Sequence, residues 1–267
     1  MADSRIIKHC AEGRDGDLIL SPLTGMWSKS SVLTVDPSIA PVVFFDDFAD
    51  FGVGATTGIW TLNNTNGTAV LGTADVNGLG GVVVLATGGV LAENYASIKV
   101  TTTDTGAPFM IVSNSGKKLW FEVRLYMSAA ADESFYVGLF TDDVAQPGIN
   151  DFGTENLGVA QDGIYFRTVN GTPTELDWAC TKNGTEAEVK GNLDTWAATT
   201  WTRLGFYFDG VTSVVPYVDG VVSGSVMSTG LTDFPDDIGL TPLLYLKDGA
   251  GVAKEMWVDY IRVVQDR

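Results

Sequence analysis

Two carboxylates on alternate residues are the first candidates for chemistry in this sequence. Glu175 and Asp177 lie in Glu175–Ala179, which we predict to be a strand. Because successive side chains of a strand point to opposite faces, both carboxylates lie on one face. Carboxylates on one face are the residue type that general acid/base chemistry uses. An ordinary strand surface is the other interpretation of the same two residues.

Nucleophile–base and zinc chemistry lack the residues that they need. His9 is the single histidine, so the sequence offers no serine or cysteine triad and no histidine-rich zinc site. Its neighbour Cys10 and the distant Cys180 are too few for a disulfide framework, and we expect free thiols. A disulfide between them stays open for a protein that works outside a cell.

Proteins usually bind sugars through exposed aromatic side chains, here those on a sheet face. The candidate glycan-binding residues are Trp120, Tyr126, Tyr165 and Trp178. Packing in the core is the alternative location for each of them.

The stretch Trp201–Val222 predicts a meander of antiparallel strands. Its β-branched and aromatic runs end at Asp209-Gly210 and Asp219-Gly220, and glycine supplies the positive φ that tight turns need. We interpret both aspartates as turn formers, because each follows an apolar run and precedes a glycine. We expect the meander to be scaffold, with any working surface in the N-terminal segment or on an exposed face or loop.

The rest of the chain repeats this pattern of short strands. Leu119–Met127 alternates, with Leu119, Phe121, Val123 and Leu125 on one face, and roughly fourteen such strands follow one another with turn signals every 8–15 residues. No helix is expected. The spacing predicts an all-β fold, a single two-sheet antiparallel sandwich that spans residues 43–267.

Composition limits the partners. The net charge of −17 argues against nucleic acid and anionic membranes, since both are polyanions. It also favours solubility, which is the simpler explanation. The chain has no apolar run long enough for a transmembrane helix, and the start MADSRIIKHC has no apolar signal core, so we expect synthesis in a cytosol.

Residues 1–42 differ from the remainder and predict an extended N-terminal arm. Their formal charge is −1, from Arg5, Lys8, Arg14 and Lys29 against Asp3, Glu12, Asp15, Asp17 and Asp36. The arm is too apolar for a disordered terminus, and we expect it to pack on its own domain or on a neighbouring subunit. The residues expected to bind the partner are Ile6, Ile7, Leu18, Ile19, Leu20, Met26 and Trp27.

Three strand-level segments resemble the concanavalin A-like jelly roll of legume lectins, laminin-G-type modules and laminarinase/lichenase-type glucanases. Phe45-Asp46-Asp47-Phe48, with Trp60 downstream, resembles the family's opening strand. "KLWFEVRLYM" (118–127) resembles its central strand, and "EMWVDYIRVVQ" (255–265) is very similar to the glucanases' closing strand. The resemblance covers residues 43–265 and implies a jelly-roll sandwich.

The same resemblance bears on catalysis. The glucanases carry a Glu-x-Asp-x-(x)-Glu strand, whose carboxylates act as nucleophile and general acid/base. Glu175 and Asp177 match the first two positions, but Ala179 or Cys180 stands at the last one. We therefore expect a non-catalytic domain.

Calcium is the cofactor that the resemblance implies. Members of this fold often hold the ion on the sheet face away from the glycan cleft, with an aspartate of the closing strand as a ligand. Asp259 matches that position, and Asp46 and Asp47 are expected nearby, since first and last strands are commonly neighbours. Hard oxygen ligands suit Ca²⁺. A strand-end aspartate without an ion is the alternative.

Two functions follow from these expectations. The first is a virion structural protein, because a Gly/Thr/Asn-rich sandwich behind a short arm is similar to the decoration (cement) proteins of tailed bacteriophages. Its partners would be the major capsid protein and further copies of itself, as in a trimer, through arm contacts and strand addition. The alternative is a carbohydrate-binding module of a phage tail or bacterial surface that uses a concave sheet face.

Overall fold

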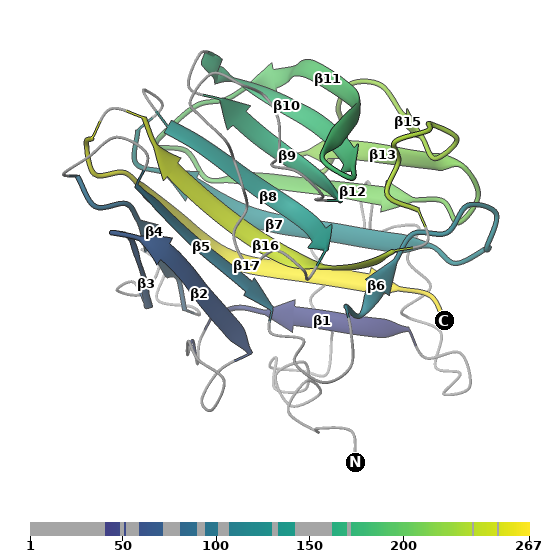
Figure 1. Ribbon diagram of the computed structural model, residues 1–267, viewed down its shortest axis with the longest axis horizontal. Helices are drawn as coiled ribbons and strands as arrows, with labels where there is room; N and C mark the ends of the chain where they lie inside the picture. Colours follow the sequence, from purple (N-terminus) through teal and green to yellow (C-terminus); the bar gives the residue numbers. More distant parts are fainter. Residues whose placement is uncertain are drawn as a thin grey trace.

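A computed structural model describes residues 41–48, 51, 59–71, 81–89, 94–100, 107–129, 133–141, 162–169, 172–236, 238–249 and 251–267. Within these ranges the regular structure consists of seventeen strands. They form two antiparallel sheets that pack face to face (Figure 1). The predicted all-β sandwich is confirmed. The described ranges contain no helix that could cross a membrane.

Sheet A has nine strands. Its order is β14 (Val221–Val222), β13 (Ser213–Val218), β12 (Thr202–Phe208), β7 (Leu119–Met127), β17 (Glu255–Gln265), β4 (Val83–Ala86) and β3 (Thr68–Leu71). In addition, β1 (Val42–Asp46) pairs with β17, and β15 (Met227–Ser228) pairs with β13. The first and last described strands are therefore neighbours, as Figure 1 shows and as the sequence led us to expect.

Sheet B has eight strands. Its order is β11 (Thr185–Thr195), β10 (Thr172–Lys182), β9 (Gly163–Val169), β8 (Glu133–Thr141), β16 (Gly239–Asp248), β5 (Tyr95–Val100) and β2 (Trp60–Thr65). The short β6 (Phe109–Met110) pairs with β16.

The core between the sheets follows from the alternation of side chains along each strand. On β7, Leu119, Phe121, Val123 and Leu125 are fully buried, as predicted. Phe121 stacks on Phe206 of β12, with ring centroids 4.9 Å apart, and Phe206 contacts Trp178 of sheet B at 5.1 Å. Burying each such side chain contributes about 1.5–3 kcal/mol, so these aromatic contacts fix how the two sheets face each other.

The meander is built by its two Asp-Gly turns. Asp209 Oδ1 accepts hydrogen bonds from the backbone N–H groups of Val211, Thr212 and Ser213 at 2.7–3.1 Å. Asp219 and Gly220 both have positive φ (50° and 80°), as a two-residue hairpin between β13 and β14 requires. Both aspartates are turn formers, as predicted.

The N-terminal segment enters the described structure at its last residues. Val42, assigned to the arm, already pairs with Gln265 as the first residue of β1. The expected arm residues Ile6, Ile7, Leu18, Ile19, Leu20, Met26 and Trp27 lie outside the described residues, as do His9 and Cys10. Cys180 is fully buried in the core.

Candidate functional site

The four aromatic residues expected to bind a glycan do not share a surface. Trp178 is in the core, fully buried against Phe166 and Phe206. Tyr165 is on the outer face of sheet B, whereas Trp120 and Tyr126 are on the outer face of sheet A, the opposite side of the sandwich. Trp178 is a correction to our expectation: on β10 it alternates with the outward Asp177 and faces the core.

The outer face of sheet B carries tyrosines, but they are closed to solvent. Tyr95, Tyr136, Tyr165 and Tyr245 pack together there, and none is more than 8% exposed. Asp177 lies on the same face. Its Oδ2 is 3.6 Å from Nε of the fully buried Arg167, and its Oδ1 accepts a hydrogen bond from the Asn192 N–H at 3.0 Å. These four tyrosines and Asp177 therefore offer a sugar no exposed ring face and no open pair of carboxylates.

The predicted calcium ligands have other partners. Asp46 accepts hydrogen bonds from the Phe48 N–H at 2.7 Å and from the Trp60 indole at 2.6 Å. Asp259 forms an ion pair with Arg124 at 2.6 Å. Within the described ranges, no group of three His, Cys, Asp or Glu side chains could hold a metal. Asp46 and Asp259 thus make different contacts, and a calcium site that combines them with Asp47 stays a prediction.

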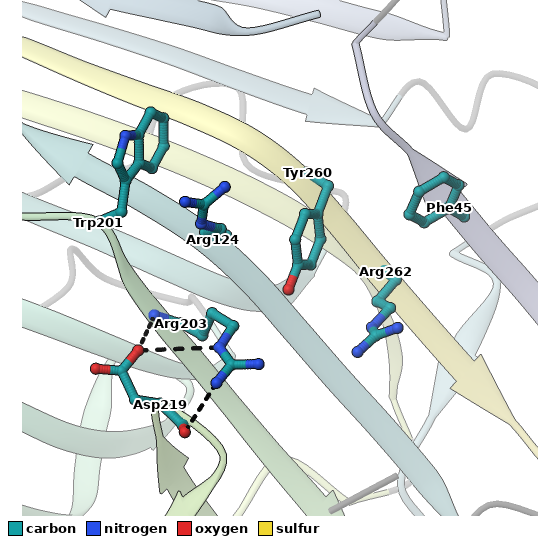
Figure 2. A pocket seen from close by; sticks show the side chains of 7 residues that line it. All are labelled: Phe45, Arg124, Trp201, Arg203, Asp219, Tyr260 and Arg262. Atoms are coloured by element: carbon teal, nitrogen blue, oxygen red, sulfur yellow. Dashed lines mark hydrogen bonds and ion pairs between the residues drawn. The ribbon is translucent and has the colours of Figure 1, made fainter. Parts of the chain in front are cut away.

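An open hollow on the outer face of sheet A is the best candidate site. It has a volume of about 550 Å³. Its lining residues come from β1, β7, β17, the start of β12 and the turn after β13, and Figure 2 shows how they lie around it. They are Phe45, Arg124, Trp201, Arg203, Asp219, Tyr260 and Arg262.

Strand register produces this grouping. Tyr260 of β17 is directly opposite Arg124 of β7, which is opposite Arg203 of β12. Opposed residues of an antiparallel ladder point to the same face, so these three side chains form one row across three strands. We call Tyr260, Arg124 and Arg203 the arginine row.

A second row runs beside the first and is aromatic. Trp257 of β17 is opposite Tyr126 of β7, and their rings are 5.9 Å apart. Trp201, just before β12, contacts Tyr126 at 5.6 Å. We call Trp257, Tyr126 and Trp201 the aromatic row. All three are partly exposed, so parts of their rings face solvent.

The two rows touch through Trp201. The Arg124 guanidinium carbon lies 4.8 Å from the centre of the Trp201 ring. A guanidinium over an indole is attracted by the ring's π electrons and is held with its plane defined. Tyr126 is thus the one predicted glycan-binding residue that lies at the hollow, in the row that borders it.

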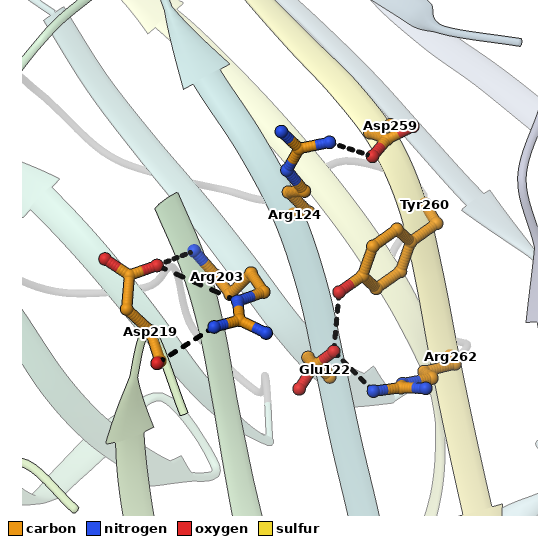
Figure 3. Close-up of polar contacts among 7 residues, drawn as sticks. All are labelled: Glu122, Arg124, Arg203, Asp219, Asp259, Tyr260 and Arg262. Atoms are coloured by element: carbon orange, nitrogen blue, oxygen red, sulfur yellow. Dashed lines mark hydrogen bonds and ion pairs between the residues drawn. The ribbon is translucent and has the colours of Figure 1, made fainter. Parts of the chain in front are cut away.

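Each arginine of the hollow is held by an acidic residue, as Figure 3 shows. Arg124 Nη1 donates to Asp259 Oδ2 at 2.6 Å. Arg203 Nη2 donates to the backbone oxygen of Asp219 at 3.0 Å, and Arg262 Nη2 donates to Glu122 Oε1 at 2.6 Å. These contacts fix the guanidinium planes before any ligand arrives, which lowers the entropy cost of binding.

Tyr260 is held by the same carboxylate as Arg262, that of Glu122 on β7. Its hydroxyl donates to Glu122 Oε1 at 2.6 Å. Burial, and then the negative charge of Glu122, raise the pKa of the Tyr260 phenol well above its ordinary value. The hydroxyl therefore remains neutral and keeps its proton at physiological pH.

Sequence reasoning missed the arginine row, although a signal for it existed. The outward positions of three strand segments carry an arginine within three residues of an aromatic residue: Arg124 with Tyr126, Arg203 with Trp201, and Arg262 with Tyr260. We expected the meander to be scaffold only, yet Trp201, Arg203 and Asp219 come from it. The signal could not be used without the strand order, which places β7 between β12 and β17.

The comparisons with known proteins bear on the fold. No protein-family model and no curated protein match the sequence. Among solved structures, the chain is similar to the carbohydrate recognition domain of Emp47p, with a TM-score of 0.55 and 13% identity over 86% of this chain and 98% of that one. It is also similar to a β-glucanase of Bacillus licheniformis, with a TM-score of 0.50 and 18% identity over 83% and 97% of the two chains.

A third similar structure is the endo-β-1,4-glucuronan lyase of the fungus Trichoderma reesei, with a TM-score of 0.55 and 14% identity over 82% and 94%. At these identities the likeness establishes the fold and leaves function to the site. The chain has the concanavalin A-like jelly-roll sandwich of lectin and glucanase domains.

Proposed function

We propose that this chain is a carbohydrate-binding protein and that the hollow on the outer face of sheet A is its sugar site. The observation that carries the proposal is the aromatic row, which lies partly exposed beside three pre-positioned arginines. This combination of ring faces and convergent polar groups is typical of small-ligand sites.

The two rows suit the two sides of a sugar. A pyranose presents C–H groups on its ring faces, and these pack against the apolar face of an indole or phenol. Its hydroxyl groups radiate around the ring and accept hydrogen bonds from the fixed N–H donors of guanidinium groups. Arg124 covers part of one face of the Trp201 ring, so a sugar packed against the exposed part of that ring would have its hydroxyls next to Arg124.

The proposal is for binding without turnover. Glycoside hydrolysis generally needs two carboxyl groups that flank the bond, and Asp219 is the one carboxylate among the hollow's lining residues. On sheet B, Asp177 lies against Arg167, and Ala179 occupies the next outward position of β10. Incubation with β-glucans should release no reducing sugar; release that Glu175→Gln abolishes would contradict this part of the proposal.

Carbohydrate binding was the alternative function that we inferred from the sequence, and the similar solved structures support it better than a role in a virion. The similar solved structures include a carbohydrate recognition domain and a glucanase. The role in a virion remains a prediction, which rests on the arm outside the described residues.

A glycan array tests the proposal directly. The full chain should bind a subset of immobilised glycans, and Trp201→Ala should abolish that binding while leaving the circular dichroism spectrum unchanged, since Trp201 is only partly buried. Val221→Ala is a matched control, because Val221 is an exposed apolar residue (69%) on β14 and not part of the hollow. A silent array, or full binding by Trp201→Ala, would overturn the proposal.

A further inference from the structure

We propose that the hollow selects acidic sugars, with the carboxylate or sulfate group of the sugar seated between Arg124 and Arg203. This inference rests on the proposed function and adds the chemical class of the ligand. It is carried by the arrangement of charge around the two guanidinium groups.

The first observation is a cross-strand pair of like charges. Arg124 and Arg203 are directly opposite each other on β7 and β12. Like charges at opposed positions destabilise a sheet, because the two side chains leave the backbone close together and on the same face. Asp259 and Asp219 already offset part of this repulsion, and an anion between the two guanidinium groups would offset it further.

The second observation is where the carboxylates lie. Asp259 holds Arg124 from the β17 side, and Asp219 holds Arg203 from the β13 side, as Figure 3 shows. The acidic partners flank the arginine pair and do not lie between its two members. Arg124 uses Nη1 for Asp259, and a guanidinium has five N–H donors, so donors remain for a ligand.

The third observation is the local sign of the charge. The hollow is lined by three arginines and one aspartate, in a chain whose net charge is −17. Counted together with their ion-pair partners Asp259, Asp219 and Glu122, the three arginines carry no net charge. The long-range field of the chain repels anions, and any preference for them must therefore come from direct contacts in the hollow.

Arginine is also the side chain suited to this task. Its planar fork binds a carboxylate or sulfate through two parallel hydrogen bonds, which a lysine cannot reproduce. Trp201 lies against Arg124, so one sugar unit can stack on the indole and place its acidic group at the guanidinium. A neutral sugar would gain the stacking contact and hydrogen bonds to its hydroxyl groups, but not the stronger hydrogen bonds of a guanidinium to an anion.

Calorimetric titration of the full chain with matched oligosaccharides tests the inference. The probes are a glucose oligomer, the glucuronate oligomer of the same length and linkage, and the sulfated glucose oligomer. We expect the acidic probes to bind about 10- to 100-fold more tightly than the neutral one, since a hydrogen bond to a charged group contributes about 1.5–3 kcal/mol. The two acidic probes distinguish a carboxylate from a sulfate.

Three variants locate the effect. Arg203→Ala should reduce the preference to near unity, and Arg203→Lys, which keeps the charge and loses the fork, should restore only part of it. Lys182→Ala is the matched control, because the Lys182 side chain on sheet B is as exposed as that of Arg203 (32% and 34%), also forms an ion pair, and its loss changes the net charge equally. Its preference should match that of the unmodified chain.

The outcomes separate the two proposals. Equal affinity for neutral and acidic probes, or an unchanged preference in Arg203→Ala, would overturn the acidic-sugar inference and leave carbohydrate binding standing. Binding to none of the probes in titration or on the array would overturn both. Sedimentation that shows a dimer of the full chain dispersed by Arg203→Ala, without sugar binding, would make the hollow a contact between copies and would likewise overturn both.

Discussion

Glu122 supports two of the residues that line the hollow, Tyr260 and Arg262. One of its carboxylate oxygens accepts hydrogen bonds from the Tyr260 hydroxyl and from Arg262, both at 2.6 Å. Its side chain is 5% exposed and that of Arg262 is 10% exposed, so the pair is largely removed from water. Removing one partner of such a pair is costly, because the other charge stays in a poorly solvated place.

We predict that Glu122→Gln lowers the free energy of unfolding by about 3 kcal/mol, since Arg262 then lacks its carboxylate. Urea denaturation followed by tryptophan fluorescence measures the change. Asp219→Asn is the control: the Asp219 side chain is 57% exposed, and the change should stay below about 1 kcal/mol. Similar losses in both variants would show that the Glu122 contacts are not special.

Tyr260 gives a prediction about pH. Burial and Glu122 raise its pKa above the ordinary value of 10.0 in the folded chain. Above that pH the unfolded chain has lost the phenolic proton while the folded chain keeps it, so the unfolded state binds fewer protons. The free energy of unfolding should therefore fall as pH rises above 10.

Tyr260→Phe isolates this contribution. The variant should be about 1 kcal/mol less stable at neutral pH, since a hydrogen bond is lost, and should lose less stability on going to alkaline pH. Urea unfolding at neutral pH and between about pH 9 and 11 measures both effects. The pKa of Tyr207 is also raised, by burial and by Asp209, but its contribution is common to both proteins. Equal pH slopes would contradict the assignment to Tyr260.

At the scale of elements, β17 positions the site through one irregularity. Its register with β7 shifts between Val258 and Tyr260, so Asp259 is an extra residue, a β-bulge. On its other edge β17 pairs with β4 up to Val258 and with β1 from Ile261. The bulge thus lies in the gap between β4 and β1, so it interrupts neither of these two pairings.

We predict that the chain tolerates deletion of Asp259. Val258 would still face the core and Tyr260 would still face outward, and the loss should be about 2 kcal/mol, the size of one charged hydrogen bond. Deletion of Ile261, the control, would instead turn Arg262 toward the core. Near-ultraviolet circular dichroism and urea titration should show cooperative unfolding for the first deletion alone; two unfolded proteins would refute this account of the bulge.

The elements themselves were largely predictable from sequence. The prediction of the inward face of β7 was correct because the alternation along this strand is unbroken. The prediction of both Asp-Gly turns was correct because a positive φ restricts the residue type. Trp178 was misplaced as a surface candidate for a related reason. Alternation says that Trp178 and Asp177 face opposite ways, but on a strand buried on both sides it does not say which way is inward.

At the scale of the whole molecule, the candidate site depends on pairing between distant strands. The arginine row combines residues 124, 203 and 260, and nothing local to any of them specifies that β7 lies between β12 and β17. The resemblance of the closing strand suggested a calcium site at Asp259, yet the carboxylate pairs with Arg124 from another strand. Local pattern predicts the sandwich, whereas the site is set by register across the sheet.

The location of the bound sugar tests the central claim most directly. We would determine the crystal structure of the full chain with the tightest-binding oligosaccharide found in the titrations. The account predicts a sugar ring against Trp201, with its acidic group within hydrogen-bonding distance of Arg124 and Arg203. A sugar bound instead over Tyr136 and Tyr165, on the outer face of sheet B, would contradict it.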